Sequence, residues 1–448
     1  MAKKNSNVSS NLQETSFNEL NDILNKISPN GDILEDSIYA RIDEWIPTGS
    51  YILNAAMSGS LFGGMPNRRS LGLGGESGAG KTYVAMSLCR NAQAMGYSIV
   101  YFDSEGAIDV DFVKRLGVDP KKFRIENINT IEEFATITAK LNESIKSIRI
   151  AGKIPPKIMV VLDSLGNLSS TKEKEDTTEG SGKRDMTKQQ AVRRTFRVVG
   201  NDFAMNAIPL IVCAHTYTMI GSYIPGQEVS GGGGLKYNVS ILFMLTKSKL
   251  NDKDSEDHVK NQNIEGSKVG IVVTCNPIKQ RFARPIKVQI HIPFYKRPNP
   301  YVGLEKFISW KTCGIIRGKA LTEKEYTKLK PNEQNTCFEY EIDVDDKKTN
   351  KSNKVKMYAF PKDTSRTLVC KHLGGEISLS ELYTDKVFTQ EVLNQLDNNI
   401  IKPTFCLPNI ESLDDLAEVT SELIDGTEMN DVDVLDVTGD ILNEMNED

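Results

Sequence analysis

The sequence predicts an α/β fold in which a mostly parallel sheet is covered by helices on both faces. Two observations carry this prediction. Between residues 46 and 295, short and nearly continuous apolar segments alternate with longer segments of helical periodicity, which is the pattern of buried parallel strands linked by helices. A glycine-rich segment, residues 75–82, also stands between one predicted strand and one predicted helix, as phosphate-binding loops do in such sheets.

The predicted elements follow in order along the chain. The first strands are RRSLGLGG (68–75), YSIVYFDSE (97–105), PKIMVVLDSLG (156–166) and IPLIVCAHT (208–216). The helices are KTYVAMSLCRNAQAMG (81–96), DFVKRLG (111–117), IEEFATITAKLNESIKSI (131–148) and MTKQQAVRRTFRVVGNDFAMN (186–206). The segments VSILFMLT (239–246), SKVGIVVTC (267–275) and RPIKVQIHI (284–292) then follow with little helix between them. They predict extra strands at one edge of the sheet, in antiparallel pairing.

Three segments flank this core. Residues 1–45 form a polar leader and a short helical arm, with apolar residues at helical spacing on one face: Phe17, Leu20, Leu24 and Ile27. This face packs either on its own domain or on a partner, which would make the arm an oligomerisation element. Residues 296–407 predict a smaller α+β domain with a charged hairpin at 343–358. Residues 408–448 are acidic and predicted to be disordered.

Length and composition limit the class of protein. A chain of 448 residues is long enough for two or three domains. Its seven cysteines are scattered without a C-x-x-C pair, which indicates free thiols in a reducing compartment. Cys370 and His372 lack a second ligand pair at zinc spacing. The N-terminus has no signal-peptide core and no segment has the length of a membrane span, so we expect a cytoplasmic protein without a membrane partner.

The charge is unevenly distributed along the chain. The net charge is −5, yet no lysine or arginine follows Lys402, and residues 403–448 hold 14 acids. Without those 14 negative charges, residues 1–402 carry +9. A basic body with an acidic tail is typical of a protein that binds a polyanion and regulates that binding. A solubilising disordered tail would explain the same composition.

The segment GESGAGKT matches the phosphate-loop pattern G-x-x-x-x-G-K-[ST] in full. In such loops the backbone N–H groups turn inward around phosphates, the lysine contacts the β- and γ-phosphates, and the last hydroxyl binds Mg²⁺. We therefore expect a nucleoside triphosphate, ATP or GTP, and Mg²⁺ as ligands. The candidate nucleotide-binding residues are Gly75, Glu76, Ser77, Gly78, Ala79, Gly80, Lys81, Thr82 and Tyr83.

Acidic residues end two of the predicted strands. Asp163 closes IMVVLD, at the sheet edge where the phosphate loop also lies, and is a candidate for the Mg²⁺ site; capping the strand end is the simpler alternative. Asp103 and Glu105 close the strand after the phosphate-loop helix. Either could polarise a water molecule that attacks the γ-phosphate, and both could merely cap the next helix.

Two long loops leave the same sheet edge, at residues 169–185 and 217–234. Open α/β sheets bind ligands there, and long loops in compact domains are often functional. The first loop and the helix after it are rich in cations, and the second combines tyrosines and a methionine with the glycine run 231–234. This composition suits single-stranded nucleic acid, although a mobile solvated loop has the same composition.

Several segments together resemble one protein family. They are TGSYILNAAMSG (48–59), GLGGESGAGKT (72–82), YFDSEGAIDVDFVKRLGVDP (101–120), VVLDSLGNLSSTKEKEDT (160–177), DMTKQQAVRRTFRVV (185–199), IPLIVCAHTYT (208–218) and GGGGLKY (231–237). They resemble the RecA-type recombinases and, within these, the UvsX recombinases of tailed bacteriophages. The resemblance covers residues 45–310 well, is loose to 402 and fades beyond.

This resemblance implies a RecA-type core and a DNA-dependent ATPase that uses ATP and Mg²⁺. Such a protein forms helical filaments of identical subunits on single-stranded DNA and catalyses pairing and strand exchange with homologous double-stranded DNA. The resemblance also implies two protein partners, a recombination mediator or loader and a single-strand-binding protein. If the protein comes from a phage, its compartment is the host cytoplasm.

The resemblance also assigns roles to single residues. Glu105 matches the catalytic glutamate, which decides against Asp103, while Asp109 and Phe112 match positions that contact the adenine ring. His215 stands where bacterial RecA proteins have a glutamine that senses the γ-phosphate, and the phage relatives resemble this chain in having histidine. The segment PIKQRFARP (277–285) resembles the one that reaches the neighbouring subunit's ATP, so that Lys279 and Arg281 would act there in trans.

The two loops match the family's DNA-binding loops, at residues 169–187 and 216–234. The candidate DNA-binding residues are Lys183, Arg184, Met186, Lys188, Arg193, Arg194, Tyr217, Met219, Gly231, Gly232 and Gly233. The main alternative is a hexameric replicative DNA helicase or another ring-forming ATPase with the same core. Residues 1–45 are too few for the N-terminal helical domain that a helicase would carry. A regulatory nucleotide-binding module is a third alternative, which the basic body and the paired loops disfavour.

Overall fold

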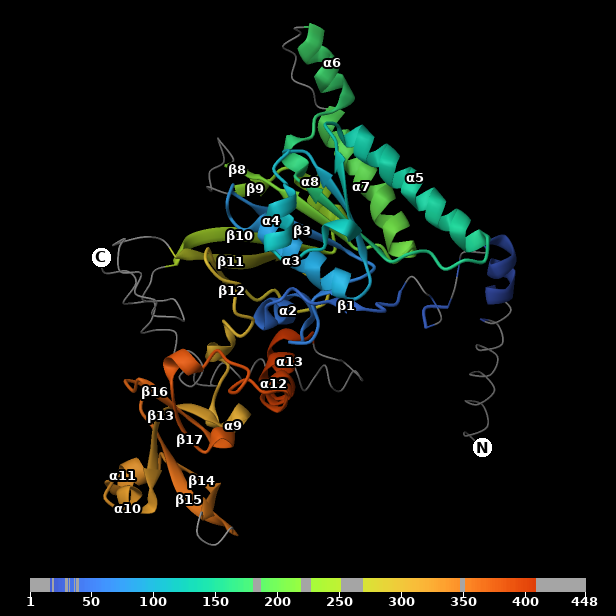
Figure 1. The fold of residues 1–448 in the computed structure, drawn as a ribbon. Coiled ribbons are helices and arrows are strands. Elements are labelled where there is room, and N and C mark those ends of the chain that lie inside the picture. Colours follow the sequence, from blue (N-terminus) through green and yellow to red (C-terminus); the bar gives the residue numbers. More distant parts are fainter. Residues whose placement is uncertain are drawn as a thin grey trace, which may run out of the picture.

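The computed structural model describes residues 17, 20–28, 31, 33–35, 37, 40–179, 187–218, 227–250, 269–346 and 351–407. Within these residues, eight strands form one central sheet in the order β12-β11-β10-β3-β7-β6-β4-β5 (Figure 1). Its strands are β3 (Ser70–Gly75), β4 (Ser98–Asp103), β5 (Phe123–Asn127), β6 (Ile158–Asp163), β7 (Leu210–Ala214), β10 (Ile241–Leu250), β11 (Gly270–Lys279) and β12 (Val288–Pro293).

The pairing of the strands confirms a mostly parallel sheet. The strands from β10 through β3, β7, β6 and β4 to β5 pair in parallel, whereas β11 pairs antiparallel with both β10 and β12. The expected antiparallel edge is therefore present, with β10 joined to the core in parallel. The sequence patterns did not predict β5, which lies at the opposite edge and is mostly polar and exposed.

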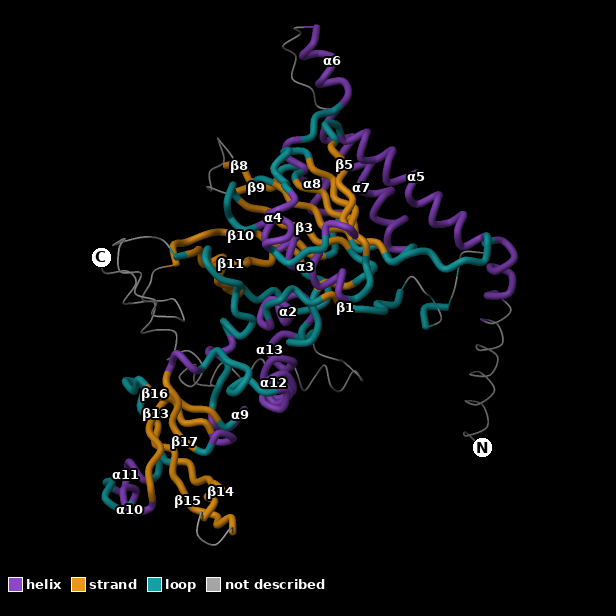
Figure 2. Tube along the Cα trace, in the orientation of Figure 1, coloured by secondary structure: helices purple, strands orange, loops and turns teal. Residues whose placement is uncertain are grey.

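Helices cover both faces of this sheet. They are α2 (Tyr51–Ser58), α3 (Lys81–Ala94), α4 (Val110–Arg115), α5 (Ile131–Ile150), α7 (Thr187–Met205) and α8 (Gly232–Asn238). Successive strand residues point to opposite faces, so Tyr101 packs in the cluster with α2 and α3 while Phe102 packs in the cluster with α5, α7 and α8. Figure 2 shows α5 and α7 lying along the same face of the sheet.

Short elements border the core. They are β1 (Trp45–Ile46), β2 (Met65–Pro66), β8 (Thr216–Thr218), β9 (Gln227–Val229), α6 (Thr171–Glu179), η1 (Pro120–Lys122) and η2 (Leu165–Asn167). The helix α6 corrects the expectation of a long irregular loop at 169–185. Its first turn is fixed by a reciprocal cap, because the backbone N–H of Glu173 donates to Ser170 Oγ at 3.0 Å and that of Ser170 to Glu173 Oε2 at 3.3 Å.

A second, antiparallel sheet builds the smaller domain. Its described strands pair in the order β14-β15-β13-β16-β17, with the predicted charged hairpin as β14 and β15. The elements of this domain are η3 (Leu304–Lys306), α9 (Trp310–Cys313), β13 (Ile315–Thr322), α10 (Glu323–Tyr326), α11 (Pro331–Gln334), β14 (Phe338–Asp346), β15 (Lys351–Pro361), β16 (Thr367–Cys370), η4 (Lys371–Leu373), β17 (Gly375–Ser378) and η5 (Leu379–Glu381).

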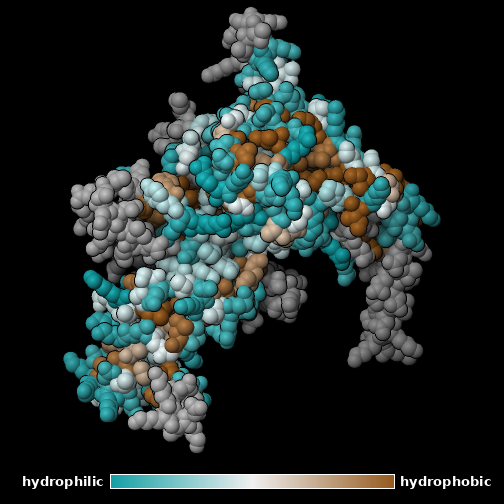
Figure 3. Space-filling view, viewed as in Figure 1, coloured by the Kyte–Doolittle hydropathy of each residue, from teal (hydrophilic) through white to brown (hydrophobic). Residues whose placement is uncertain are grey.

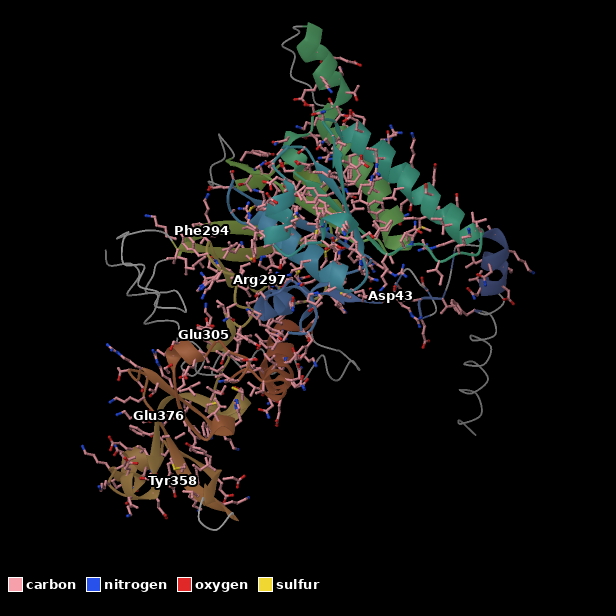
Figure 4. The ribbon with its side chains drawn as sticks, viewed as in Figure 1. Asp43, Phe294, Arg297, Glu305, Tyr358 and Glu376 are labelled. Atoms are coloured by element: carbon pink, nitrogen blue, oxygen red, sulfur yellow. The ribbon has the colours of Figure 1, made fainter. Side chains whose placement is uncertain are left out.

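The chain then returns to the core through α12 (Gln390–Leu396), the π-helical turn η6 (Asp397–Ile401) and α13 (Lys402–Phe405). Asp397, which is 2% exposed, accepts hydrogen bonds from Ser60 Oγ at 2.9 Å and from the backbone N–H of Leu61 at 2.7 Å. Between the two parts, Tyr301 stacks on Tyr51 and on Phe388. Figure 4 places Glu305 in the same connecting region. These contacts fix the smaller domain to the helix α2.

The described helices include none that is long and apolar enough to cross a membrane. Figure 3 shows apolar atoms at the surface around α5 and α7. Exposed apolar side chains on these two helices are Ile150 on α5 and Val198 on α7.

Candidate functional site

The phosphate loop connects β3 with α3 at the carboxyl edge of the parallel strands. Gly78 and Gly80 have φ values of +72° and +90°, a conformation that glycine adopts without strain. Lys81 is 6% exposed, and its Nζ donates to the carbonyl oxygens of Gly75 and Glu76, at 2.8 Å each. Burial is the main reason why the pKa of Lys81 is lowered. The loop thus places a buried cation at its centre.

Asp163 ends β6 directly beside this loop. Its Oδ2 accepts a hydrogen bond from Thr82 Oγ1 at 2.7 Å and another from the Tyr101 hydroxyl at 2.7 Å. Burial and the nearby Asp163 raise the pKa of Tyr101, so this hydroxyl stays a donor. Asp163 is 6% exposed. The structure thus joins the two residues that the sequence predicted for Mg²⁺ and adds a tyrosine that the sequence patterns did not single out.

Glu105 and His215 meet at the same edge. His215 Nε2 lies 2.8 Å from Glu105 Oε1, and the same oxygen accepts a hydrogen bond from Ser164 Oγ at 2.7 Å. Partial burial acts to raise the pKa of Glu105, but the hydrogen bonds from Ser164 and His215 outweigh it and the pKa is lowered. Glu105 is therefore ionised at neutral pH, and among the described residues its Oε2 accepts no hydrogen bond.

Asp103 has a different environment. Its side chain is 3% exposed and accepts hydrogen bonds from the backbone N–H groups of Glu105 at 2.9 Å, Gly106 at 2.8 Å and Ile108 at 3.4 Å. These bonds use the carboxylate to hold the turn that presents Glu105. The geometry therefore favours Glu105 over Asp103 as the group that faces a reacting water molecule.

The nucleotide-binding candidates that follow the phosphate loop lie at two places, with the two adenine candidates Asp109 and Phe112 apart from Tyr83. Asp109 is the N-cap of α4 and accepts a hydrogen bond from the backbone N–H of Phe112 at 2.7 Å, so these two residues lie together. Tyr83 lies in the first turn of α3, and burial raises its pKa. Among the described residues, no hydrogen bond or ring contact connects Tyr83 with Asp109 or Phe112.

Three of the described candidates for DNA binding line one pocket of about 240 Å³ between α7 and the β8–β9 hairpin. It is lined by Lys188, Tyr217 and Gly231, among others. Arg193 packs against the glycine run, because a Cβ at Gly233 would lie 3.3 Å from its Nη2. Arg194 is exposed on α7 but is not part of this pocket. Gly232 begins α8 beside the pocket.

Four candidates for DNA binding, Lys183, Arg184, Met186 and Met219, lie outside the described residues. The acidic tail at 408–448 lies outside them as well.

Lys279 and Arg281 lie away from the phosphate loop of their own chain. Lys279 on β11 pairs with Leu242 on β10, and Leu242 pairs with Gly72 on β3. Lys279 therefore lies two strands away from β3, level with a residue three positions before the loop begins. That is roughly 10 Å across the sheet and 10 Å along it. Lys279 Nζ donates to the carbonyls of Lys236 and Tyr237, at 3.0 and 2.8 Å, in the last turn of α8.

Arg69 joins these two cations. It immediately precedes β3, and burial, Arg281 and Arg68 lower its pKa. Burial and Arg281 likewise lower the pKa of Lys279. Arg69 just before β3 and Lys279, which aligns with Gly72 through Leu242, therefore both lie toward the end of β3 that is opposite the phosphate loop, and Arg281 follows Lys279 by two residues.

The sequence patterns missed Tyr101, Ser164, Arg69 and Lys247. Lys247 Nζ donates to the carbonyl oxygen of Ser77 at 2.6 Å. Ser164 directly follows Asp163, so its place at the strand end was a usable signal. The other three lie inside or just before strands, where nothing in the periodicity separates a functional side chain from a structural one.

Comparisons with known proteins give matches to one family. The family model of the RecA N-terminal domain matches residues 23–296. The recombination and repair protein of Enterobacteria phage T4 is 27% identical over 257 residues, which cover 56% of this chain and 60% of that protein. Protein RecA of Treponema denticola is 27% identical over 265 residues, covering 58% of each chain.

Protein RecA of Mycobacterium sp. (strain KMS) is 29% identical over 231 residues, covering 51% of this chain and 61% of that protein. The chain thus spans about 60% of the length of these three relatives. The family model covers more than half of this chain and contains every strand of the central sheet. The chain therefore belongs to the RecA family.

Proposed function

We propose that the chain is a DNA-dependent ATPase that assembles into ATP-bound helical filaments on single-stranded DNA. In such filaments it catalyses homologous pairing and strand exchange in recombination, repair and recombination-dependent replication. The observation that supports this most directly is the split of the cations. Lys81 lies in the phosphate loop, whereas Lys279, Arg281 and Arg69 lie at the far end of β3.

The residues at the sheet edge suit ATP hydrolysis. Glu105 is ionised, and its Oε2 is available to orient a water molecule and accept its proton as the water oxygen bonds to the γ-phosphorus. The bond from the γ-phosphorus to the bridging oxygen then breaks and leaves ADP. Lys81 and the loop N–H groups stabilise the negative charge on the phosphate oxygens. Ser164 and His215 hold Glu105 in place.

The same edge suits Mg²⁺. The ion favours oxygen ligands and is commonly held by one or two protein groups together with phosphates and water. Thr82 Oγ1 and Asp163 Oδ2 lie 2.7 Å apart and would hold it. The described residues contain no cluster of three acidic, histidine or cysteine ligands, which agrees with an ion that depends on the nucleotide for its remaining ligands. When bound, Mg²⁺ neutralises phosphate charge.

The cations at the far end of β3, which we call the far cations, are Lys279, Arg281 and Arg69. They suit a contact between two copies of the chain. Lys279 and Arg281 are too distant to reach the nucleotide of their own chain, so they would meet the nucleotide of a neighbour that docks head to tail. A contact between two different surfaces of the same chain repeats and produces an open helical filament unless it closes into a ring. The helical arm supports such assembly, because Leu20, Ile23 and Ile27 on it are 51%, 52% and 73% exposed.

The pocket between α7 and the β8–β9 hairpin suits single-stranded DNA. Lys188 and Arg193 supply positive charge, Tyr217 is 46% exposed for stacking, and the glycine run permits close approach of the backbone. The carbonyl of His215 accepts a hydrogen bond from the backbone N–H of Ser230 at 2.7 Å. A nucleotide-dependent movement of His215 would therefore pass directly to the base of the hairpin, a known type of switch.

ATP hydrolysis with and without single-stranded DNA, combined with electron microscopy of the same mixtures, tests the proposal. We expect DNA to stimulate hydrolysis, helical filaments to form with ATP, and Lys81→Ala to abolish hydrolysis. Hydrolysis without DNA stimulation would refute the proposal. Closed rings that unwind a forked duplex would instead identify a helicase. We propose three further partners: homologous duplex DNA, a mediator and a single-strand-binding protein. These would then be added to the filaments.

A further inference from the structure

Lys247 lies beside the phosphate loop although it comes from a different strand. The strand β10 runs parallel to β3, and Leu245 pairs with Gly75. The next residues of β10 therefore continue past the end of β3, alongside the loop. Lys247 Nζ reaches the loop and donates to the carbonyl oxygen of Ser77 at 2.6 Å.

The glycine after Ser77 leaves room for this amine. A Cβ built at Gly78 would lie 3.1 Å from Lys247 Nζ, which is its nearest neighbour there. The amine thus lies over the middle of the loop, between the end of β3 and the start of α3. This is the part of the motif whose backbone N–H groups surround the phosphates.

Two lysines therefore hold consecutive carbonyls of one loop. Lys81 donates to Gly75 and Glu76, and Lys247 donates to Ser77. Both amines are positively charged, and an anion with several charges at the loop would attract both of them. Lys247 is exposed, so its side chain is free to exchange the carbonyl for another acceptor.

We propose that Lys247 is a second cationic ligand of the nucleotide's phosphates, supplied by the same chain that holds the loop. This inference rests on the proposed ATP site. Lys247 Nζ leaves the carbonyl of Ser77 and donates to a phosphate oxygen at the terminal end of the nucleotide. Unlike Lys279 and Arg281, it acts in the isolated chain, and it favours ATP over ADP because ATP carries the larger negative charge.

The test is calorimetric titration of the full chain with ATP and with ADP, in Mg²⁺ and without DNA. Lys247→Met should weaken ATP binding about tenfold and ADP binding less, because a charge-assisted hydrogen bond is lost. Lys247→Arg should restore most of the ATP affinity. Lys249→Met is the matched control, since it removes the same charge two residues further along β10, and it should bind both nucleotides like the wild type.

Equal ATP affinity of Lys247→Met and the wild type would overturn the proposal. Equal losses in Lys247→Met and Lys249→Met would also overturn it, because they would show a general effect of charge. An unchanged melting temperature without nucleotide confirms that the variants fold, and Lys247→Gln provides a second neutral variant. If Lys81→Ala binds ATP as tightly as the wild type, the proposed ATP site itself is wrong, which separates the two failures.

Discussion

Replacing Tyr101 by phenylalanine should destabilise the core through a single lost hydrogen bond. The Tyr101 hydroxyl donates to Asp163 Oδ2 at 2.7 Å, and the tyrosine has no exposed surface. Asp163 is only 6% exposed, so water replaces the lost donor poorly. Phenylalanine keeps the ring and its stacking on Phe123 at 5.2 Å. The substitution therefore isolates the hydroxyl.

The size of the effect follows from this environment. A hydrogen bond to a charged acceptor contributes about 1.5–3 kcal/mol when it is buried. Asp163 keeps the second donor, Thr82 Oγ1, so we expect Tyr101→Phe to lower the free energy of unfolding by about 2 kcal/mol. With saturating Mg²⁺ and ADP, the substitution should lower the free energy of unfolding by less, because the proposed metal site places a cation beside the same carboxylate.

Tyr97→Phe is the matched control. The Tyr97 hydroxyl donates to Glu44 Oε2 at 2.8 Å, and the Glu44 side chain is 29% exposed and also pairs with Lys157. Water and Lys157 satisfy Glu44 after the substitution, so the loss should stay below about 1 kcal/mol. Urea unfolding followed by circular dichroism measures both variants. Equal stability of Tyr101→Phe and the wild type would refute the reasoning, as would equal losses in the two variants.

Two further predictions concern Glu105 and the tail. Ser164→Ala removes a hydrogen bond that holds the pKa of Glu105 below its ordinary value of 4.5 against partial burial, so the acid limb of the pH–rate profile for ATP hydrolysis should move to higher pH. The variant's stability loss should be present at neutral pH and vanish as the pH falls through the pKa of Glu105; an unchanged acid limb would contradict the assignment. Removing residues 408–448, which carry all 14 of the tail's acids, should tighten single-stranded DNA binding by roughly tenfold at moderate salt, since the tail competes with phosphate for the basic body. Unchanged or weaker binding in a fluorescence-anisotropy titration would count against this competition.

The sequence predicted the parts of the site that follow directly from strand ends. The phosphate loop, Asp163 and Glu105 each lie at or within two residues of the end of an apolar strand. The carboxyl ends of parallel strands meet at one edge, so the sequence alone predicts that these residues lie close together. The structure brings Thr82 and Asp163 within 2.7 Å and Glu105 and His215 within 2.8 Å at this edge.

Other parts could not be predicted because no local pattern marks them. Tyr101 is one aromatic residue inside an apolar strand, and its bond to Asp163 depends on the register of β4 and β6. Lys247 reaches the loop only because β10 inserts beside β3. The strand β5 is polar at an exposed edge and lacks the apolar run of a buried strand. The helix α6 is polar throughout its sequence TKEKEDTTE, so no apolar periodicity marks it as a helix.

A mixing experiment tests most directly whether a neighbouring copy completes the site. Lys81→Ala lacks the phosphate-loop cation but keeps the far cations, whereas Lys279→Ala/Arg281→Ala keeps the loop and lacks two of them. Each variant alone should show little DNA-stimulated ATP hydrolysis. An equal mixture should recover about a quarter of the wild-type rate, because in random head-to-tail assembly that share of contacts joins an intact loop to intact cations. A mixture whose rate is only the average of the two separate variants would contradict the account.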